Sequence, residues 1–212
     1  MQIAKVAQEK DLIVISDEIY DKIVYSGIKH VSFPELSDDA KERTILVNGV
    51  SKTYSMTGWR IGYAAGNPKV ISAMNNLSGQ STSNPTSISQ KAAIEAFSGT
   101  QEKVKEMLAE FETRKNYISS YLNEIKDIEC FVPDGAFYVF PNISAYFGKK
   151  YNDKVITNSL EFTDFLLDVA KVAVVPGVEF GSDSHIRISY ATSMSDIKQG
   201  LERIKESLST LI

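Results

Sequence analysis

The sequence has very little of what disulfide-bonded proteins and metal enzymes depend on. Cys130 is the only cysteine among 212 residues, so an internal disulfide is impossible and a reducing cytoplasm is expected. Cys130 lies in the strand-like run 128–132, where a buried, inert thiol is expected rather than a nucleophile. The two histidines, His30 and His185, are far apart and have no partner pattern. Neither a metal site nor a serine-type catalytic triad is therefore indicated.

Long hydrophobic runs and an excess of one charge are also absent. No run reaches membrane-spanning length, and the first ten residues, MQIAKVAQEK, contain no apolar signal core. The net charge is −4 and the two signs are interspersed, so neither nucleic acid nor an anionic membrane is expected as a partner. Hydrophobic residues make up 43% and charged residues 24%, as is usual in a soluble globular protein.

Strand-like and helix-like patterns are mixed along the chain, which indicates an α/β fold. The run 12–16 (LIVIS) is continuously apolar, as expected for a parallel strand buried on both faces. Further strands are expected at 22–25, 44–47, 60–65, 129–132, 136–140, 172–175 and 185–190. Helices are expected at 2–10, from Asn67-Pro68, from Asn84-Pro85 to Phe97, at 160–170, and after a capping Ser195, with 26–41 mostly loop.

The longest periodic segment begins at Thr100 and continues at helical spacing to about Ile125. A helix of this length can join two domains, and the pattern beyond it consists mainly of short strand-like pieces. We therefore expect a domain boundary near residue 110, with residues 111–212 forming an α+β domain.

The stretch 47–66, VNGVSKTYSMTGWRIGYAAG, carries a lysine and an arginine on a loop between two strand-like runs. The Lys52 amine can form an imine, and the planar fork of the Arg60 guanidinium suits a phosphate. Gly58 and Gly62 allow close backbone approach beside that arginine. This pair suits a ligand with an electrophilic carbon and a phosphate, although a lysine in a polar loop is by itself more often a solvated charge.

A second motif lies upstream, where the apolar run 12–16 ends in Asp17-Glu18-Ile19-Tyr20. Acidic residues fit poorly inside buried strands, so Asp17 marks the carboxyl end of the strand, where open α/β sheets bind ligands. In combination, SDEIY (16–20) and SKTYSMTGWRIGY (51–63) resemble the fold-type I pyridoxal-phosphate (PLP) enzymes. They are most similar to class I aminotransferases related to bacterial aspartate aminotransferase, and the resemblance extends over the whole chain.

The resemblance implies the C-terminal part of a PLP-binding large domain at 1–110, with a mainly parallel sheet and helices on both faces. A small α+β domain follows at 111–212. It further implies a cytoplasmic homodimer that moves an amino group between an α-amino acid and a 2-oxo acid, with L-aspartate and 2-oxoglutarate as the best match. A PLP-dependent C–S lyase of the same fold shares these motifs and stays open as an alternative.

The resemblance also assigns a role to each residue of the candidate cofactor site. It makes Lys52 the Schiff-base lysine, which also moves the proton between the substrate α-carbon and the cofactor. Asp17 pairs with the pyridine nitrogen, and Tyr20 donates to the phenolic oxygen. Arg60 holds the phosphate, and Ser51 adds a hydroxyl to it. Each assignment has an alternative without a cofactor. Lys52 and Arg60 are then surface charges, Asp17 is a turn aspartate, and Tyr20 is a half-buried aromatic residue.

Arg187, within HIRIS (185–189), matches the arginine that binds the substrate α-carboxylate in the family, with an exposed strand arginine as the alternative. Some family members carry a hydroxyl three residues before the lysine, where this chain has Gly49. Ser83 and Asn84 resemble a segment that approaches the neighbouring subunit's site.

Part of the expected site has no counterpart before Asp17, because only 16 residues precede it. In family members, the chain before the position of Asp17 contains a Gly/Ser-rich turn that binds the phosphate, a ring that stacks on the pyridine, and an asparagine that contacts the phenolic oxygen. We therefore expect the C-terminal half of an aminotransferase, binding PLP weakly by itself. The alternative is a non-catalytic fragment that acts as an interaction or dimerisation module.

Overall fold

The computed structural model describes residues 2–212 and divides the chain into two compact units, Met1–Glu106 and Met107–Ile212. The long helix α5 (Glu102–Glu124) runs from one unit into the other, as the periodicity from Thr100 predicts. The assignment of 1–110 and 111–212 to a large and a small domain stays a prediction. None of the helices described for residues 2–212 combines the length and the apolar character that a transmembrane span requires.

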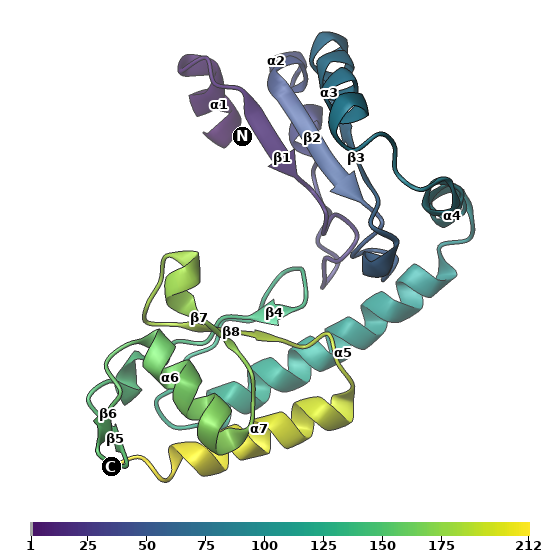
Figure 1. Ribbon diagram of the computed structural model, residues 1–212. Helices are drawn as coiled ribbons and strands as arrows, with labels where there is room; N and C mark the ends of the chain where they lie inside the picture. The colour runs from purple at the N-terminus through teal and green to yellow at the C-terminus, as the bar shows by residue number, and fades with distance from the viewer. Residues whose placement is uncertain (1) are drawn as a thin grey trace. The chain divides into compact units, whose positions relative to one another are not determined.

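Unit 1 is built on a three-stranded sheet of order β1-β2-β3, consisting of β1 (Val14–Asp17), β2 (Thr44–Gly49) and β3 (Gly62–Ala65) (Figure 1). Strands β1 and β2 are parallel, with Asp17 opposite Val47. Strands β2 and β3 are antiparallel, with Gly49 opposite Gly62. The carboxyl ends of β1 and β2 and the start of β3 therefore meet at one edge of the sheet. The two predicted motif loops leave from this edge.

The expectation that the run 12–16 is buried on both faces is wrong for the described chain. Ile13 and Ile15 are 69% and 71% exposed, whereas Val14 and Ser16 are half-buried. Successive side chains of a strand point to opposite faces, so only one face of β1 is covered by unit 1. Strand β1 is also an outer strand of the sheet, with β2 as its single strand neighbour. The apolar run therefore predicts the strand correctly but predicts its burial wrongly.

Two segments of unit 1 differ from the sequence-based expectations. The predicted strand at 22–25 is reduced to a single bridge at Val24, and the buried side chains of Ile23 and Tyr25 anchor the segment to the core. The predicted loop 26–41 contains a turn of 3-10 helix, η1 (Phe33–Glu35), and the start of α2 (Asp38–Arg43). Helix α2 is capped by Ser37, whose hydroxyl accepts a hydrogen bond from the Ala40 amide at 3.0 Å.

The remaining helices of unit 1 confirm the predicted starts closely. The Asn67 side chain caps α3 by accepting from the Lys69 amide at 3.0 Å, and Pro68 occupies the first helical position. The helix expected from Asn84-Pro85 begins two residues later, at Ser87. The helical segments of this unit, other than η1, α2 and α5, are α1 (Gln2–Glu9), η2 (Thr57–Trp59), α3 (Pro68–Ser81) and α4 (Ser87–Ser98).

Unit 2 contains a second three-stranded sheet of order β4-β8-β7. Strand β8 (Ile186–Ser189) lies between β4 (Tyr138–Val139) and β7 (Val175–Pro176) and is antiparallel to both. The other elements are η3 (Ser144–Tyr146), the hairpin β5–β6 (Lys150–Tyr151 and Lys154–Val155), α6 (Ser159–Phe165), its π-helical continuation η4 (Leu166–Ala170), η5 (Gly177–Phe180) and α7 (Met194–Leu208). The predicted strand at 129–132 is wrong, because only Glu129 forms a single bridge, to Asn142.

Cys130 is buried in this irregular segment, and burial raises the pKa of its thiol to about 11. The thiol is therefore protonated at neutral pH, as expected for an inert cysteine. The core of unit 2 is formed by residues of α5, α6 and α7 together with the sheet. It includes four apolar residues at helical spacing in the last helix, Ile197, Leu201, Ile204 and Leu208.

The cap of α7 is Ser193 rather than the predicted Ser195. The Ser193 hydroxyl accepts from the Asp196 amide at 3.1 Å, because the helix begins at Met194. We expect Ser193→Ala to lower the free energy of unfolding by about 1 kcal/mol, since it leaves a first-turn amide without its acceptor. Ser195→Ala, the matched control, is expected to change it by less than about 0.5 kcal/mol. Denaturant unfolding of both variants measures the difference, and equal losses would contradict this assignment.

Candidate active site

Lys52 and Tyr20 are brought together at the sheet edge where β1 and β2 end. Lys52 lies in the turn after β2, and Tyr20 lies three residues beyond β1. Both side chains are half-buried, and the Lys52 Nζ lies 5.9 Å from the centroid of the Tyr20 ring. The pairing is decided by the parallel register of β1 and β2, which places the two following turns side by side.

The two residues that follow Lys52, Thr53 and Tyr54, hold its turn in place. The Thr53 side chain is buried, and its hydroxyl donates to Asp21 Oδ1 at 3.3 Å. The Tyr54 hydroxyl donates to Gln101 Oε1 at 3.1 Å, and its ring meets Phe97 edge-on at 5.5 Å. Sequence reasoning missed these contacts, since nothing in the local pattern links the turn to α4 and the start of α5. They limit the positions that the Lys52 amine can reach.

Asp17, at the end of β1, is exposed, and its Oδ1 accepts from the Ile19 amide at 3.1 Å. Asp17 therefore acts as a turn aspartate, which was its alternative role, and its carboxylate is also exposed at this edge of the sheet. Ser51 is half-buried beside Lys52. Arg60 is exposed, with a left-handed backbone at φ +51°, and its Nη1 donates to the Thr57 carbonyl at 3.0 Å. The register brings the start of β3 to the edge where Asp17 and Ser51 lie.

Glu18 is a buried acid that sequence reasoning did not single out. Its Oε1 accepts from the Ser16 hydroxyl and the Phe33 amide, both at 2.9 Å, and its Oε2 lies 2.9 Å from His30 Nε2. Burial raises the pKa of the Glu18 carboxyl, but hydrogen bonds from His30, Phe33, Ser32 and Ser16 outweigh it and hold this pKa below its usual value. Glu18 thus fastens the turn after β1 to the segment 30–33.

The depressed pKa of Glu18 predicts a specific loss of stability in acid. A carboxyl with a lowered folded-state pKa stabilises the protein above its unfolded pKa, and this contribution is lost as the pH falls through the folded value. We expect Glu18→Gln to lower the free energy of unfolding at pH 7 by about 1–2 kcal/mol, because an amide accepts weaker hydrogen bonds than a carboxylate.

The difference between Glu18→Gln and the unsubstituted chain is expected to shrink as the pH falls below about 4.5, where the carboxyl of the unfolded chain takes up its proton, and to disappear below the lower folded-state pKa. Unfolding measured from pH 3 to pH 7 tests this. The exposed Glu35, in Glu35→Gln, is the matched control. A difference that stays constant with pH would contradict the role of the Glu18 charge.

In unit 2, Arg187 lies on the face of β8 opposite to Ile186 and Ile188, which are 2% and 7% exposed. Arg187 is half-buried, and its guanidinium carbon lies 4.5 Å from the centroid of the Tyr138 ring and 4.3 Å from that of Phe180. Within residues 107–212, no carboxylate lies in salt-bridge distance of this guanidinium. Arg187 is therefore neither fully exposed nor neutralised by its own unit.

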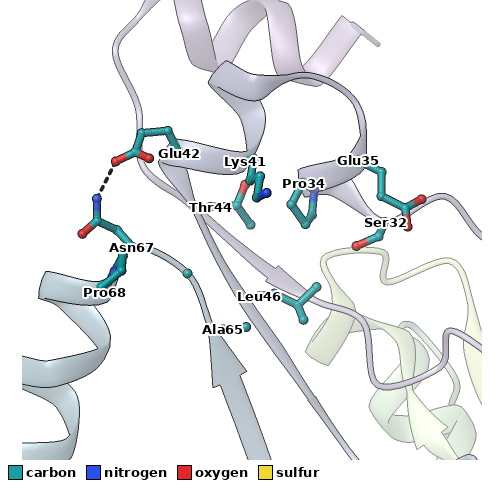
Figure 2. Close-up of a pocket in the computed structure, with 11 residues that line it drawn as sticks. Ser32, Pro34, Glu35, Lys41, Glu42, Thr44, Leu46, Ala65, Asn67 and Pro68 are labelled. Carbon is teal, nitrogen blue, oxygen red and sulfur yellow. Dashed lines mark hydrogen bonds between the residues drawn. The ribbon is translucent and has the colours of Figure 1, made fainter.

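A cavity of about 680 Å³ in unit 1 is lined by none of the predicted site residues (Figure 2). Leu46 and Ala65 form part of its wall, and the Asn67 amide donates to Glu42 at one side. Lys52, Asp17 and Arg60 do not line it. Among residues 2–212, no cluster of histidine, cysteine and acidic side chains is suited to a metal ion. The candidate chemistry thus rests on the sheet edge rather than on this cavity.

Comparisons with known proteins agree with the two motifs. A family profile described as Aminotransferase class I and II matches residues 1–204. The aspartate aminotransferase of Bacillus subtilis (strain 168) is 50% identical over 203 residues, covering 96% of this chain and 51% of that protein. The probable aspartate/prephenate aminotransferase of Rickettsia typhi is 49% identical over 199 residues, covering 93% of this chain and 50% of that protein.

Solved structures give the same result. The aspartate aminotransferase from Rhizobium meliloti matches with a TM-score of 0.94 and 41% identity, covering 99% of this chain and 53% of that one. The aromatic aminotransferase from Pyrococcus horikoshii OT3 matches with a TM-score of 0.90 and 36% identity, covering 98% and 54%. The chain spans about half the length of these relatives, and the predicted α/β fold is confirmed. The chain belongs to the aminotransferase class I and II family.

Proposed function

We propose that this chain carries the lysine-bearing part of an aminotransferase that uses PLP to move an amino group between an α-amino acid and a 2-oxo acid. The observation that supports it most is the approach of the Lys52 amine to the Tyr20 ring at the edge where β1 and β2 end. The donor set at this edge fits the cofactor: an amine for its aldehyde, a phenol for its ring oxygen, a carboxylate for its ring nitrogen and a guanidinium for its phosphate.

When bound, the cofactor supplies an electrophilic aldehyde and an electron-withdrawing ring. The Lys52 amine would hold the cofactor through its aldehyde, and once free it would take and return the proton at the substrate α-carbon. The Asp17 carboxylate would accept the ring N–H and favour a protonated ring nitrogen. The Tyr20 hydroxyl would donate to the phenolic oxygen, while Arg60 and Ser51 would bind the phosphate.

Arg187 is proposed to bind the substrate α-carboxylate through its planar fork. The two aromatic rings against its guanidinium support this role, since the N–H edge of the group stays available for polar contacts. We propose L-aspartate and 2-oxoglutarate as the substrates. The proposal follows the similarity to two aspartate aminotransferases, from Bacillus subtilis and from Bacillus sp. (strain YM-2), the second of which is 49% identical.

The remaining features of the whole protein are also proposals. We assign residues 1–110 to part of the cofactor-binding domain and residues 111–212 to the small domain. A homodimer in the cytoplasm is the proposed state, and the exposed apolar side chains Leu77, Ile88 and Ile94 of α3 and α4 suit burial in an assembly.

A non-catalytic interaction module is the second candidate, and the uncovered apolar face of β1 favours it. Ile15 of β1 and the preceding Ile13 are mostly exposed, and β1 is an outer strand that can accept a further strand. A PLP-dependent C–S lyase shares the same donor set and differs in the bond that is cleaved. A lyase would release a thiol from a cysteine-type substrate, whereas an aminotransferase yields a 2-oxo acid from L-aspartate.

Covalent trapping tests the proposed function directly. The chain is incubated with PLP, reduced with borohydride, digested, and analysed by mass spectrometry for a pyridoxyl group. Concentration of the group on Lys52 supports the proposal. Labelling that follows exposure alone, with Lys103 (87% exposed side chain) labelled more than Lys52, contradicts it and favours the interaction module. Product analysis with L-aspartate, L-alanine and L-phenylalanine at equal concentration then tests the proposed substrate.

A further inference from the structure

Two aromatic rings, Tyr138 and Phe180, lie against the guanidinium of Arg187. Tyr138 lies on β4, where it pairs with Ser189, two residues along β8 from Arg187. This diagonal position on the same face of the sheet brings the Tyr138 ring to 4.5 Å from the guanidinium carbon. Phe180, at the end of η5, approaches to 4.3 Å. Contacts this short allow both rings to interact with the cation through their π faces.

Further rings hold these two in place. The Phe180 ring meets Phe140 edge-on at 6.1 Å, and Phe140 stacks on the His185 ring at 4.9 Å with an interplanar angle of 7°. On the other side, Tyr138 lies 4.8 Å from Phe137, and Phe137 stacks on Phe111 of α5 at 5.4 Å. Each of the two rings against Arg187 therefore contacts a further aromatic ring of unit 2, and neither is an isolated side chain.

The N–H groups of a guanidinium donate in its own plane, so an anion can bind at the N–H edge while the two rings lie against the π surface. No carboxylate of residues 107–212 lies in salt-bridge distance of that edge. A planar carboxylate can bind there through two parallel hydrogen bonds, in the plane of the guanidinium. We propose that Tyr138 and Phe180 are positioning residues, which hold the Arg187 guanidinium in one plane for a bidentate aliphatic carboxylate.

The inference rests on the proposed function for its biological meaning, but its test needs no cofactor. Propionate is the probe, and its uncharged analogue propionamide is the control ligand. Titration of the intact 212-residue chain is followed through the Arg187 Nε–H resonance in a ¹H–¹⁵N spectrum, assigned by its disappearance in Arg187→Lys. Separation of the Nη resonances reports whether rotation about the Nε–Cζ bond is slow, as expected for a guanidinium held by contacts with two rings.

We expect propionate, but not propionamide, to shift the Arg187 resonance. Phe180→Leu and Tyr138→Leu are each expected to weaken propionate binding about tenfold and to speed the Nε–Cζ rotation. Phe180→Tyr and Tyr138→Phe keep a ring and are expected to keep both properties. Phe180 is 46% exposed, so Phe180→Leu is expected to leave the fold intact even if Tyr138→Leu destabilises it. Phe131→Leu, at a 92% exposed ring of the same unit, is the matched control.

Unchanged propionate affinity in Phe180→Leu would overturn the inference, and so would equal weakening in Phe131→Leu. Absence of any shift in the unsubstituted chain would overturn it as well. Failure of the proposed function has a different signature: no pyridoxyl group on Lys52, while propionate still binds through Arg187 with the ring dependence described. The two proposals can therefore fail separately.

Discussion

Lys52→Arg is expected to remove the borohydride-trapped pyridoxyl group from the Lys52 peptide completely. The guanidinium keeps the positive charge but is not deprotonated in proteins, so it provides no neutral amine for imine formation. Any amino transfer from L-aspartate to 2-oxoglutarate that the chain supports is expected to fall by about 10²–10⁴-fold, since the proton carrier at the substrate α-carbon is lost as well. Peptide mapping by mass spectrometry and a coupled oxaloacetate assay measure the two losses.

Lys103→Arg is the matched control for this experiment. The Lys103 side chain is 87% exposed and pairs with Glu106 on the first turns of α5. This substitution is expected to leave the labelling of Lys52 unchanged. Persistence of amino transfer in Lys52→Arg, or equal losses in the two variants, would show that the Lys52 amine is not the reacting group.

Phe162→Ala is expected to have the largest effect on stability. Phe162, on α6, is 0% exposed, and its ring contacts Tyr146 at 5.8 Å and Phe165 at 6.2 Å. Removal of a fully buried aromatic ring costs the transfer free energy of its atoms and leaves a cavity, about 3–5 kcal/mol in total. Since small domains are stabilised by about 5–15 kcal/mol, the variant is expected to unfold at a much lower denaturant concentration.

Phe131→Ala tests the same chemical change at a surface position. Phe131 is 92% exposed, so its removal is expected to change the free energy of unfolding by less than about 0.5 kcal/mol. Urea unfolding followed by circular dichroism measures both variants. A loss at Phe162 no larger than the loss at Phe131 would contradict the core described for unit 2.

The sequence by itself determined the features that depend on local pattern. The Asn67-Pro68 start of α3 follows from cap chemistry, and the apolar positions of α7 follow from helical spacing. The family followed from two short motifs, which the profile over residues 1–204 confirms. Caps and helical periodicity can be predicted from the sequence because they depend on residues that lie within a few positions of one another along the chain.

Only the tertiary structure decided how segments that are distant along the chain meet. Two adjacent acids, Asp17 and Glu18, are indistinguishable by pattern, yet Asp17 is exposed and Glu18 is enclosed by hydrogen bonds from segments up to 15 residues away. The rings around Arg187 come from β4 and η5, which the sequence does not connect with β8. Burial and partners are set by which surfaces pack together, and this information is distributed over the whole fold rather than carried by any local run.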